Sequence, residues 1–325
     1  AIPVLGLRGA LVAAVLLQLA GAAAALRSGR TGTPAWIGLA AAALLALILP
    51  VRWSPEVIAS GPFLYGPRIR GEVLFHRDGR EATVTVARDG PWLSLRVNGK
   101  VDASTRGDLE TQRLLAHLGV LLHSGPKDVL VIGLASGITA GSVLTHPGVE
   151  RVTCVEIEPA VVEASSWFRA WNGVARGDPR LELVVGDGRA HMAYHQEAYD
   201  LVISEPSNPW VAGVADLFTR EAFQAARGSL RDDGVFVQWV QAYGLEPEDL
   251  RALVRTCRTV FPDATLWAEG RDLTDLALVG GAGVRRDLEG VRGVLDSGGP
   301  AAQELRLSGI VRPVDLTGRL LAEGE

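Results

Sequence analysis

The residues most able to do chemistry follow a series of apolar runs, and the first group is a glycine loop. The apolar run 128–134 contains Gly133 near its end, and Gly137 follows Gly133 by four residues. Glycine lets a backbone turn tightly and approach a ligand, and a helix that starts here offers free N–H groups. The G-x-G-x-x-G spacing of a dinucleotide site is absent, because Ala135 and Ile138 occupy two glycine positions. Taken alone, the loop also fits a packing turn.

Acidic residues stand at the ends of the next two apolar runs. Glu156 lies about 20 residues after the loop, where an acid can accept hydrogen bonds from a ribose diol. Asp187, followed by Gly188, ends the third run, where an Asp can meet the exocyclic amine of adenine. A single acid in such a place is usually a helix cap. Several polar or glycine-rich ends together favour a nucleoside site.

The fourth apolar run ends in Ser-Glu-Pro-Ser-Asn-Pro-Trp, residues 204–210. This turn places Glu205 beside Ser207, Asn208 and Trp210. The indole of Trp210 either walls a substrate pocket or packs under the loop.

A metal site is not expected. His191 and His195 have the i, i+4 spacing of metal ligands on a helix. The sequence offers no evident third ligand for them, so we expect no metal.

The elements that position these residues follow from the apolar pattern. Continuous apolar runs alternate with helix-length segments, which predicts a buried, mostly parallel sheet in a Rossmann-like α/β fold. The predicted strands cover 128–134, 151–158, 181–187, 199–205, 234–240 and 275–280. In a doubly wound sheet the carboxyl ends of these strands lie along one edge, where ligands bind.

A smaller sheet is predicted upstream, over residues 71–100. Its short alternating runs are separated by Asp78-Gly79, Asp89-Gly90 and Asn98-Gly99, which are strong hairpin-turn signals. Leucines at helical spacing then predict a helix from Asp108 to His123.

The N-terminal end contains two uncharged apolar segments, Gly9 to Leu26 and Ala35 to Leu49. A spanning helix needs roughly 20 mostly apolar residues, with a lower limit near 17. We therefore expect a membrane hairpin; a signal peptide and two buried core helices are the alternatives. The single methionine is Met192, so the chain is either processed or a piece of a longer protein. We expect the cell membrane as location, with the catalytic domain facing the cytoplasm.

Charge and cysteine content narrow the function classes. The formal net charge is −5, whereas a general nucleic-acid binder would show a basic stripe, so no nucleic-acid partner is expected. Cys154 and Cys257 each lie in an apolar run and are interpreted as buried free thiols in a reducing compartment. The predicted domains are a membrane hairpin at 1–50, a β-domain at 51–106, a catalytic domain at 107–280 and a helical tail at 281–325.

From roughly residue 73 to 280 the sequence resembles the spermidine synthases, which are aminopropyltransferases. It is most similar to a bacterial branch in which such a domain follows a multi-helix membrane region. The resemblance rests on the segments VNGKVDASTRGDLETQRLLAH, VLVIGLASGITAG, VTCVEIEPAVVEAS, DPRLELVVGDGRA and YDLVISEPSNPWVAGVADLFTREAF.

The resemblance implies a cofactor derived from S-adenosylmethionine and a small amine or polyamine substrate. Glu205 matches the position of the catalytic Asp, which orients and deprotonates the attacking amine. The cofactor-binding residues implied are Gly133, Ser136, Gly137, Glu156, Asp187 and Gly188. The substrate-binding residues implied are Gln112, Ser207, Asn208 and Trp210.

Three departures from the family pattern concern the ligands. Ser136 stands where an acid usually pairs with the ammonium of decarboxylated S-adenosylmethionine. A charged hydrogen bond of this kind is worth roughly 1.5–3 kcal/mol, so its loss would cost about ten- to a hundred-fold in affinity. Asn208 stands in place of a second acid, and Gln112 in place of a His.

We therefore expect transfer of an aminopropyl group from decarboxylated S-adenosylmethionine to an amine. The first alternative is an S-adenosylmethionine-dependent methyltransferase acting on an amine. It is favoured by Ser136 and by the Ser-Asn-Pro-Trp turn, which loosely resembles the Asn-Pro-Pro-aromatic motif of amino-methylating enzymes. The second is a non-catalytic nucleoside sensor at the membrane, against which Glu205 argues. A homodimer is a further expectation.

Overall fold

The structure is a computed structural model that describes residues 2–27, 40, 43, 54–58, 60, 71–173, 177–209, 211, 213–268, 273–285 and 289–322. The chain divides into two compact units. The first comprises Ala1–Asp89 and Arg96–Lys100, and the second comprises Gly90–Leu95 and Val101–Glu325.

The second unit is built on an eight-stranded sheet with the order β12-β10-β11-β9-β8-β5-β6-β7. Strands β5 to β9 pair in parallel, whereas β10, β11 and β12 join in antiparallel fashion. The strands are β5 (Asp128–Ile132), β6 (Arg151–Glu156), β7 (Leu181–Val185), β8 (Tyr199–Ser204), β9 (Leu230–Gln241), β10 (Thr265–Ala268), β11 (Asp275–Gly280) and β12 (Leu320–Ala322).

The predicted Rossmann-like α/β fold is thereby confirmed. Val129, Leu130 and Val131 are all fully buried, as expected of a strand covered on both faces. All six predicted strands form. Strands β10 and β12 were not predicted, since four and three residues are too few to show a periodicity.

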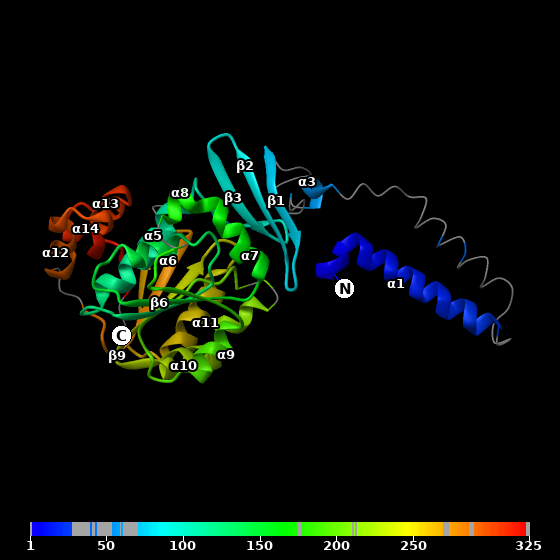
Figure 1. The fold of residues 1–325 in the computed structure, drawn as a ribbon. Coiled ribbons are helices and arrows are strands. Elements are labelled where there is room, and N and C mark those ends of the chain that lie inside the picture. Colours follow the sequence, from blue (N-terminus) through cyan, green and yellow to red (C-terminus); the bar gives the residue numbers. More distant parts are fainter. Residues whose placement is uncertain are drawn as a thin grey trace. The chain divides into compact units, whose positions relative to one another are not determined.

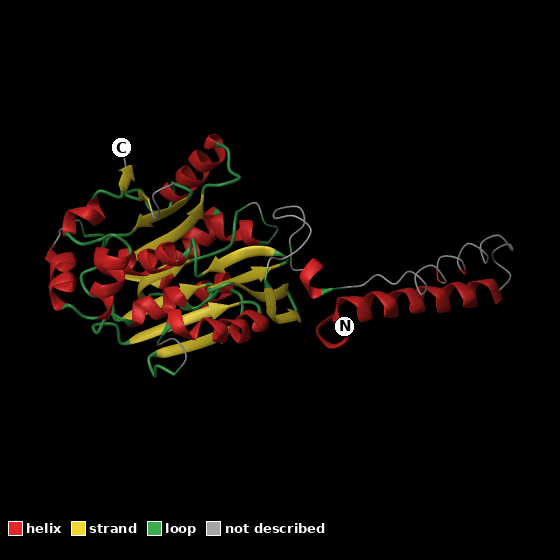
Figure 2. Cartoon of the chain, turned by 90° about the horizontal axis from the view of Figure 1, so that it is seen from above, coloured by secondary structure: helices red, strands yellow, loops and turns green. Residues whose placement is uncertain are grey.

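Helices lie on both faces of this sheet (Figure 2), and α12, α13 and α14 gather at one end (Figure 1). Their bounds are α5 (Leu109–Leu122), α6 (Ile138–Leu144), α7 (Pro159–Ala164), α8 (Arg169–Asn172), α9 (Gly188–Tyr194), α10 (Arg220–Ser229), α11 (Pro247–Arg258), α12 (Glu289–Ser297), α13 (Pro300–Leu307) and α14 (Pro313–Thr317). In the core, Phe236 stacks on Phe261 with ring centroids 5.1 Å apart and meets Phe223 edge-on at 5.9 Å.

The predicted antiparallel sheet is also present, with the order β1-β2-β3-β4. Its strands are β1 (Glu72–Asp78), β2 (Thr83–Asp89), β3 (Trp92–Val97) and β4 (Lys100–Ser104). The turn between β3 and β4 holds Asn98 at φ +50° and Gly99 at φ +83°, the two positive values that a type I′ hairpin turn requires.

Near the N-terminus, helix α1 (Ile2–Arg27) contains the first predicted membrane segment, and α3 (Pro55–Ile58) is a single turn. Within the described residues, no helix combines enough length and apolar character to cross a membrane. The predicted membrane hairpin is therefore not supported by the structure. Its second segment, Ala35 to Leu49, lies outside the described residues except for two isolated positions.

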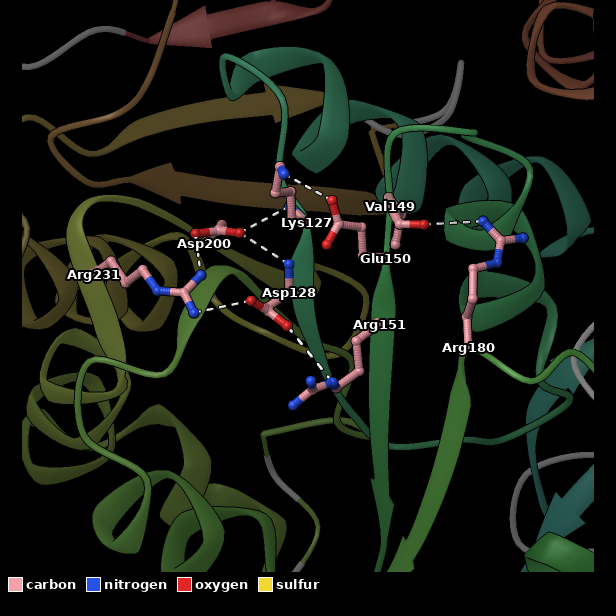
Figure 3. A network of polar contacts seen from close by, with 8 residues as sticks. All are labelled: Lys127, Asp128, Val149, Glu150, Arg151, Arg180, Asp200 and Arg231. Carbon is pink, nitrogen blue, oxygen red and sulfur yellow. Dashed lines mark hydrogen bonds and ion pairs between the residues drawn. The ribbon is translucent and has the colours of Figure 1, made fainter.

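A polar network ties together the amino ends of the parallel strands (Figure 3). The Asp200 carboxylate accepts hydrogen bonds from the backbone N–H groups of Lys127 at 2.8 Å and Asp128 at 2.9 Å. The Arg231 guanidinium bridges the carboxylates of Asp200 and Asp128. Burial acts to raise the pKa of Asp200, but the Asp128 and Lys127 N–H groups and Arg231 outweigh it, so this pKa is lowered. The network joins β5, β8 and β9 at one edge of the sheet.

We predict that Asp200→Ala lowers the free energy of unfolding by about 2–4 kcal/mol, because it leaves two backbone N–H donors without their acceptor and removes one of the two carboxylates that Arg231 bridges. Urea unfolding measures the loss. The matched control is Glu248→Ala, which removes an exposed carboxylate–arginine pair with Arg251 and should cost about 0.5 kcal/mol or less. Since the pKa of Asp200 is lowered, its contribution is lost as the pH falls through the folded-state pKa. Equal losses in the two variants would contradict the assignment.

Candidate functional site

The loop after β5 depends on two glycines. Gly133 has φ +92°, and a Cβ there would lie 2.6 Å from the carbonyl oxygen of Glu205. Gly137 has φ +79° and precedes α6. The Gly133 N–H donates to the carbonyl of Val155 at 2.9 Å. The loop therefore runs close against the ends of both β6 and β8, and a side chain at residue 133 would push it away.

Glu156, the last residue of β6, braces this loop. Its Oε2 accepts from the Leu134 N–H at 3.0 Å, and its Oε1 accepts from the Glu158 N–H at 2.9 Å. Burial raises the pKa of Glu156, and the Glu158 and Leu134 N–H groups oppose that rise. A carboxylate has about four acceptor positions, so Glu156 keeps capacity for a ligand hydroxyl.

Ser136 and Gln112 bind each other. Ser136 is fully buried and its hydroxyl donates to Gln112 Oε1. Gln112 Nε2 donates to the carbonyl of Asp108 at 3.0 Å, while the Thr139 hydroxyl donates to the Gln112 carbonyl at 3.1 Å. Gln112 on α5 thus holds the glycine loop and the first turn of α6 in place.

Asp187 acts as the N-cap of α9. Its Oδ1 accepts from the N–H groups of Arg189 at 2.7 Å and Ala190 at 3.1 Å. The side chain is exposed beside the carboxyl end of β7, where the sequence predicts contact with adenine. A Cβ on Gly188 would lie 2.5 Å from Ile132 Cγ2, so glycine permits α9 to approach β5.

Glu205 follows the last residue of β8 and is 6% exposed. Burial raises its pKa to about 8; the Thr139 side chain opposes the rise, and the charge of Asp108 adds to it. A carboxyl group with this pKa can exchange a proton near neutral pH, as a general base requires.

Two side-chain hydrogen bonds hold the turn that follows Glu205. The Ser207 hydroxyl donates to Asp102 Oδ1 at 2.7 Å. The Tyr243 hydroxyl donates to Oδ1 of the fully buried Asn208 at 3.2 Å. Trp210 lies outside the described residues. The structure therefore brings Ser207 and Asn208 to the same strand end as Glu205, together with Asp102 and Tyr243.

Sequence reasoning missed Thr139, Asp108 and Gln241 at this site. Gln241 is the last residue of β9, and its Nε2 donates to the Pro206 carbonyl at 3.4 Å. A polar residue at the carboxyl end of a fifth strand is the signal that would have found it. Thr139 and Asp108 act on the pKa of Glu205 through the packing of α5 against α6, which no motif encodes.

His191 and His195 lie elsewhere, toward the amino ends of the strands. Their rings stack with centroids 4.0 Å apart, and His191 Nε2 lies 2.7 Å from the Tyr199 hydroxyl. They line a cavity of about 360 Å³ with Arg151 and Glu182. Among the described residues, no group of three or more His, Cys, Asp or Glu side chains is arranged to hold a metal ion.

We predict that Glu205→Gln stabilises the protein at alkaline pH. The carboxyl would ionise near its ordinary pKa of 4.5 when unfolded and near a pKa of about 8 when folded. Between these pKa values the folded state binds more protons than the unfolded state, so the stability of the wild type falls as the pH rises. The loss of stability caused by ionised Glu205 is complete above pH 8. Urea unfolding at pH 8.5 should show the variant more stable by roughly 1–4 kcal/mol, and near pH 4 the difference should vanish. Glu110→Gln, an exposed position on α5, serves as the control and should leave the stability at pH 8.5 close to that of the wild type.

Comparison with known proteins relates this region to one family. Residues 109–268 match the family model of the spermine/spermidine synthase domain. A polyamine aminopropyltransferase of Bacillus mycoides (strain KBAB4) is 30% identical over 53% of this chain and 62% of its own length. Putrescine N-methyltransferase 2 of Nicotiana attenuata is 31% identical over 54% of this chain and 47% of its own length. The chain thus spans less than two thirds of these curated relatives.

Solved structures show the same fold. A spermidine synthase in complex with the transition-state analogue AdoDATO superposes with a TM-score of 0.62 at 23% identity, covering 68% of this chain and 78% of that one. The spermidine synthase of Thermotoga maritima gives a TM-score of 0.61 at 24% identity, with 68% and 77% covered. By sequence, residues 109–268 are therefore similar to the spermine/spermidine synthase domain, and they lie on the fold of solved spermidine synthases.

Proposed function

We propose that this chain transfers an aminopropyl group from decarboxylated S-adenosylmethionine to an amine. The observation that carries the proposal is Glu205, a buried carboxyl group with a pKa of about 8 at the carboxyl end of β8. Its place beside the glycine loop and Glu156 matches the edge at which ligands of such sheets bind. The relatives named as aminopropyltransferases support the reaction class.

In this proposal each residue has a defined task. The hydroxyls of the ribose bind the Glu156 carboxylate, which the loop N–H groups already hold in place. The amine nitrogen attacks the carbon next to the sulfonium, so a C–N bond forms while the C–S bond breaks and methylthioadenosine leaves. The proton that the nitrogen loses passes to Glu205. The chain supplies proximity and one base.

Methyl transfer is the second candidate, and two observations favour it. Ser136 is uncharged and its hydroxyl already bonds Gln112, so this position offers no counter-charge to the ammonium of a decarboxylated cofactor. A relative that is 31% identical over 54% of this chain is named a putrescine N-methyltransferase. Location at a membrane and a homodimer stay predictions, as does the nucleoside sensor, which would leave the buried base Glu205 without a task.

The proposed function is tested with both cofactors and one substitution. With an amine mixture, we expect consumption of decarboxylated S-adenosylmethionine and release of methylthioadenosine, both measured by chromatography. Glu205→Gln should lower this rate by about 10²–10⁴-fold, while calorimetry shows unchanged affinity for methylthioadenosine. The wild-type rate should rise with pH through about 8 as Glu205 ionises. Consumption of S-adenosylmethionine alone would make methyl transfer the function.

We also predict that Glu156→Gln weakens binding of methylthioadenosine by about ten- to a hundred-fold, because a charged acceptor for the ribose is lost. Calorimetry measures the change. The control is Glu163→Gln, an exposed position on α7, which should bind like the wild type. An unchanged affinity in Glu156→Gln would remove Glu156 from the nucleoside site.

A further inference from the structure

Three buried polar atoms near the carboxyl ends of β8 and β9 lack a hydrogen-bond partner within the described part of the chain. They are Ser204 Oγ, Asn208 Nδ2 and Gln241 Oε1. The residues are 2%, 0% and 1% exposed. Leaving a buried donor or acceptor unsatisfied costs about 1–3 kcal/mol, and folded proteins pair nearly all such groups. Two of them are linked to the turn that follows Glu205, since Asn208 lies in it and Gln241 bonds the Pro206 carbonyl, and this indicates a place that a ligand completes.

Two of these atoms belong to side chains that are oriented by their other end. Gln241 Nε2 donates to the Pro206 carbonyl, which can only accept, so the Gln241 oxygen must be the open atom. Asn208 Oδ1 accepts from the Tyr243 hydroxyl, which leaves the Asn208 N–H group open. We refer to Asn208 and Gln241 as the amide pair. It presents one open donor and one open acceptor.

The chemistry of the amide pair selects its ligand. A hydroxyl or a carboxamide both donates and accepts, so one such group has the donor that Gln241 Oε1 lacks and the acceptor that Asn208 Nδ2 lacks. An ammonium group only donates and would face the Asn208 N–H without bonding it. A carboxylate only accepts and would leave Gln241 unpaired.

The two carboxylates Asp102 and Asp108 interact with residues of the site other than the amide pair. Asp102 accepts from Ser207 and, after burial and the backbone N–H groups, contributes to the raised pKa of Glu156. Asp108 adds to the raised pKa of Glu205. The described bonds of the amide pair run to Pro206 and Tyr243, which are uncharged. A reacting amine is thus drawn toward the carboxylates, while the amide pair receives a neutral group.

Building on the proposed transfer to an amine, we propose that the acceptor is an amino alcohol or amino amide. Its amine lies at Glu205, and its hydroxyl or carboxamide is bound by the amide pair. The site discriminates against diamines, whose second ammonium cannot bond Asn208. A site built to bond a hydroxyl rejects analogues that cannot replace it, because its own buried groups then remain unpaired.

The test uses acceptors of matched shape on the full chain saturated with methylthioadenosine. Calorimetry compares 4-amino-1-butanol and 4-aminobutanamide with 1,4-diaminobutane and n-butylamine, at a pH where the amines are protonated. We expect the first two to bind about tenfold more tightly than the last two. Equal or tighter binding of 1,4-diaminobutane would overturn the proposal, since Asn208 would then present its oxygen.

Two variants sharpen this result. Asn208→Asp should reverse the preference in favour of 1,4-diaminobutane. Because a buried carboxylate can impair folding, Tyr243→Phe is the second variant. It removes the hydroxyl that orients Asn208, and Tyr243 is 44% exposed, so the substitution should be tolerated. It should reduce the preference for 4-amino-1-butanol several-fold and leave n-butylamine binding unchanged. An undiminished preference in both variants would overturn the role of Asn208.

These measurements distinguish a failure of the proposed acceptor class from a failure of the proposed transfer reaction. Tight binding of 4-amino-1-butanol without any transfer from either cofactor would overturn the proposed function and keep the amide pair as a binding site. Efficient transfer to 1,4-diaminobutane, with weak binding of the amino alcohol, would keep the function and overturn the inference.

Discussion

The structure depends on the burial of a parallel sheet from both faces, because this fixes where polar groups can go. The middle strands carry fully buried aliphatic side chains, so charged residues are confined to the two edges at which the strands start and end. At the edge where the strands start, Asp200 is bonded by Arg231 and by the Lys127 backbone N–H, so these polar groups satisfy one another. At the finishing edge, the acids and amides retain hydrogen-bonding capacity. The division explains why one edge stabilises the fold and the other can bind ligands.

The groups at the carboxyl ends of the strands lower the stability of the folded protein, and the proposed chemistry requires them. Burial that raises the pKa of Glu205 to about 8 also makes its ionised form unfavourable. The unpaired atoms of Asn208 and Gln241 add to that cost. Proteins accept such local instability where a ligand or a reaction gains from it. The glycine loop is held more firmly, because Glu156 accepts a hydrogen bond from its Leu134 N–H and Gln112 accepts one from its Ser136 hydroxyl.

Much of this could be predicted from the sequence. Long apolar runs identified β5 to β9 and β11, and turn residues such as Asn98-Gly99 identified the hairpins, because both signals are local. The ends of these runs located Glu156, Asp187 and Glu205. Partners could not be predicted: the bond between Ser136 and Gln112 joins residues 24 positions apart, and that between Ser207 and Asp102 spans 105. The membrane hairpin was expected from hydropathy alone, and the described residues do not support it.

The thiol of Cys154 has a consequence for following this loop in solution. It is completely buried in β6, and its sulfur lies 3.8 Å from the Gly133 carbonyl oxygen, directly beneath the glycine loop. Burial, with the charges of Glu156 and Glu205, raises its pKa well above the ordinary value, so it is unreactive while the sheet is closed. Alkylation of this cysteine therefore requires an opening that breaks β6 away from the loop. The rate of its modification therefore reports how often this part of the sheet opens in solution.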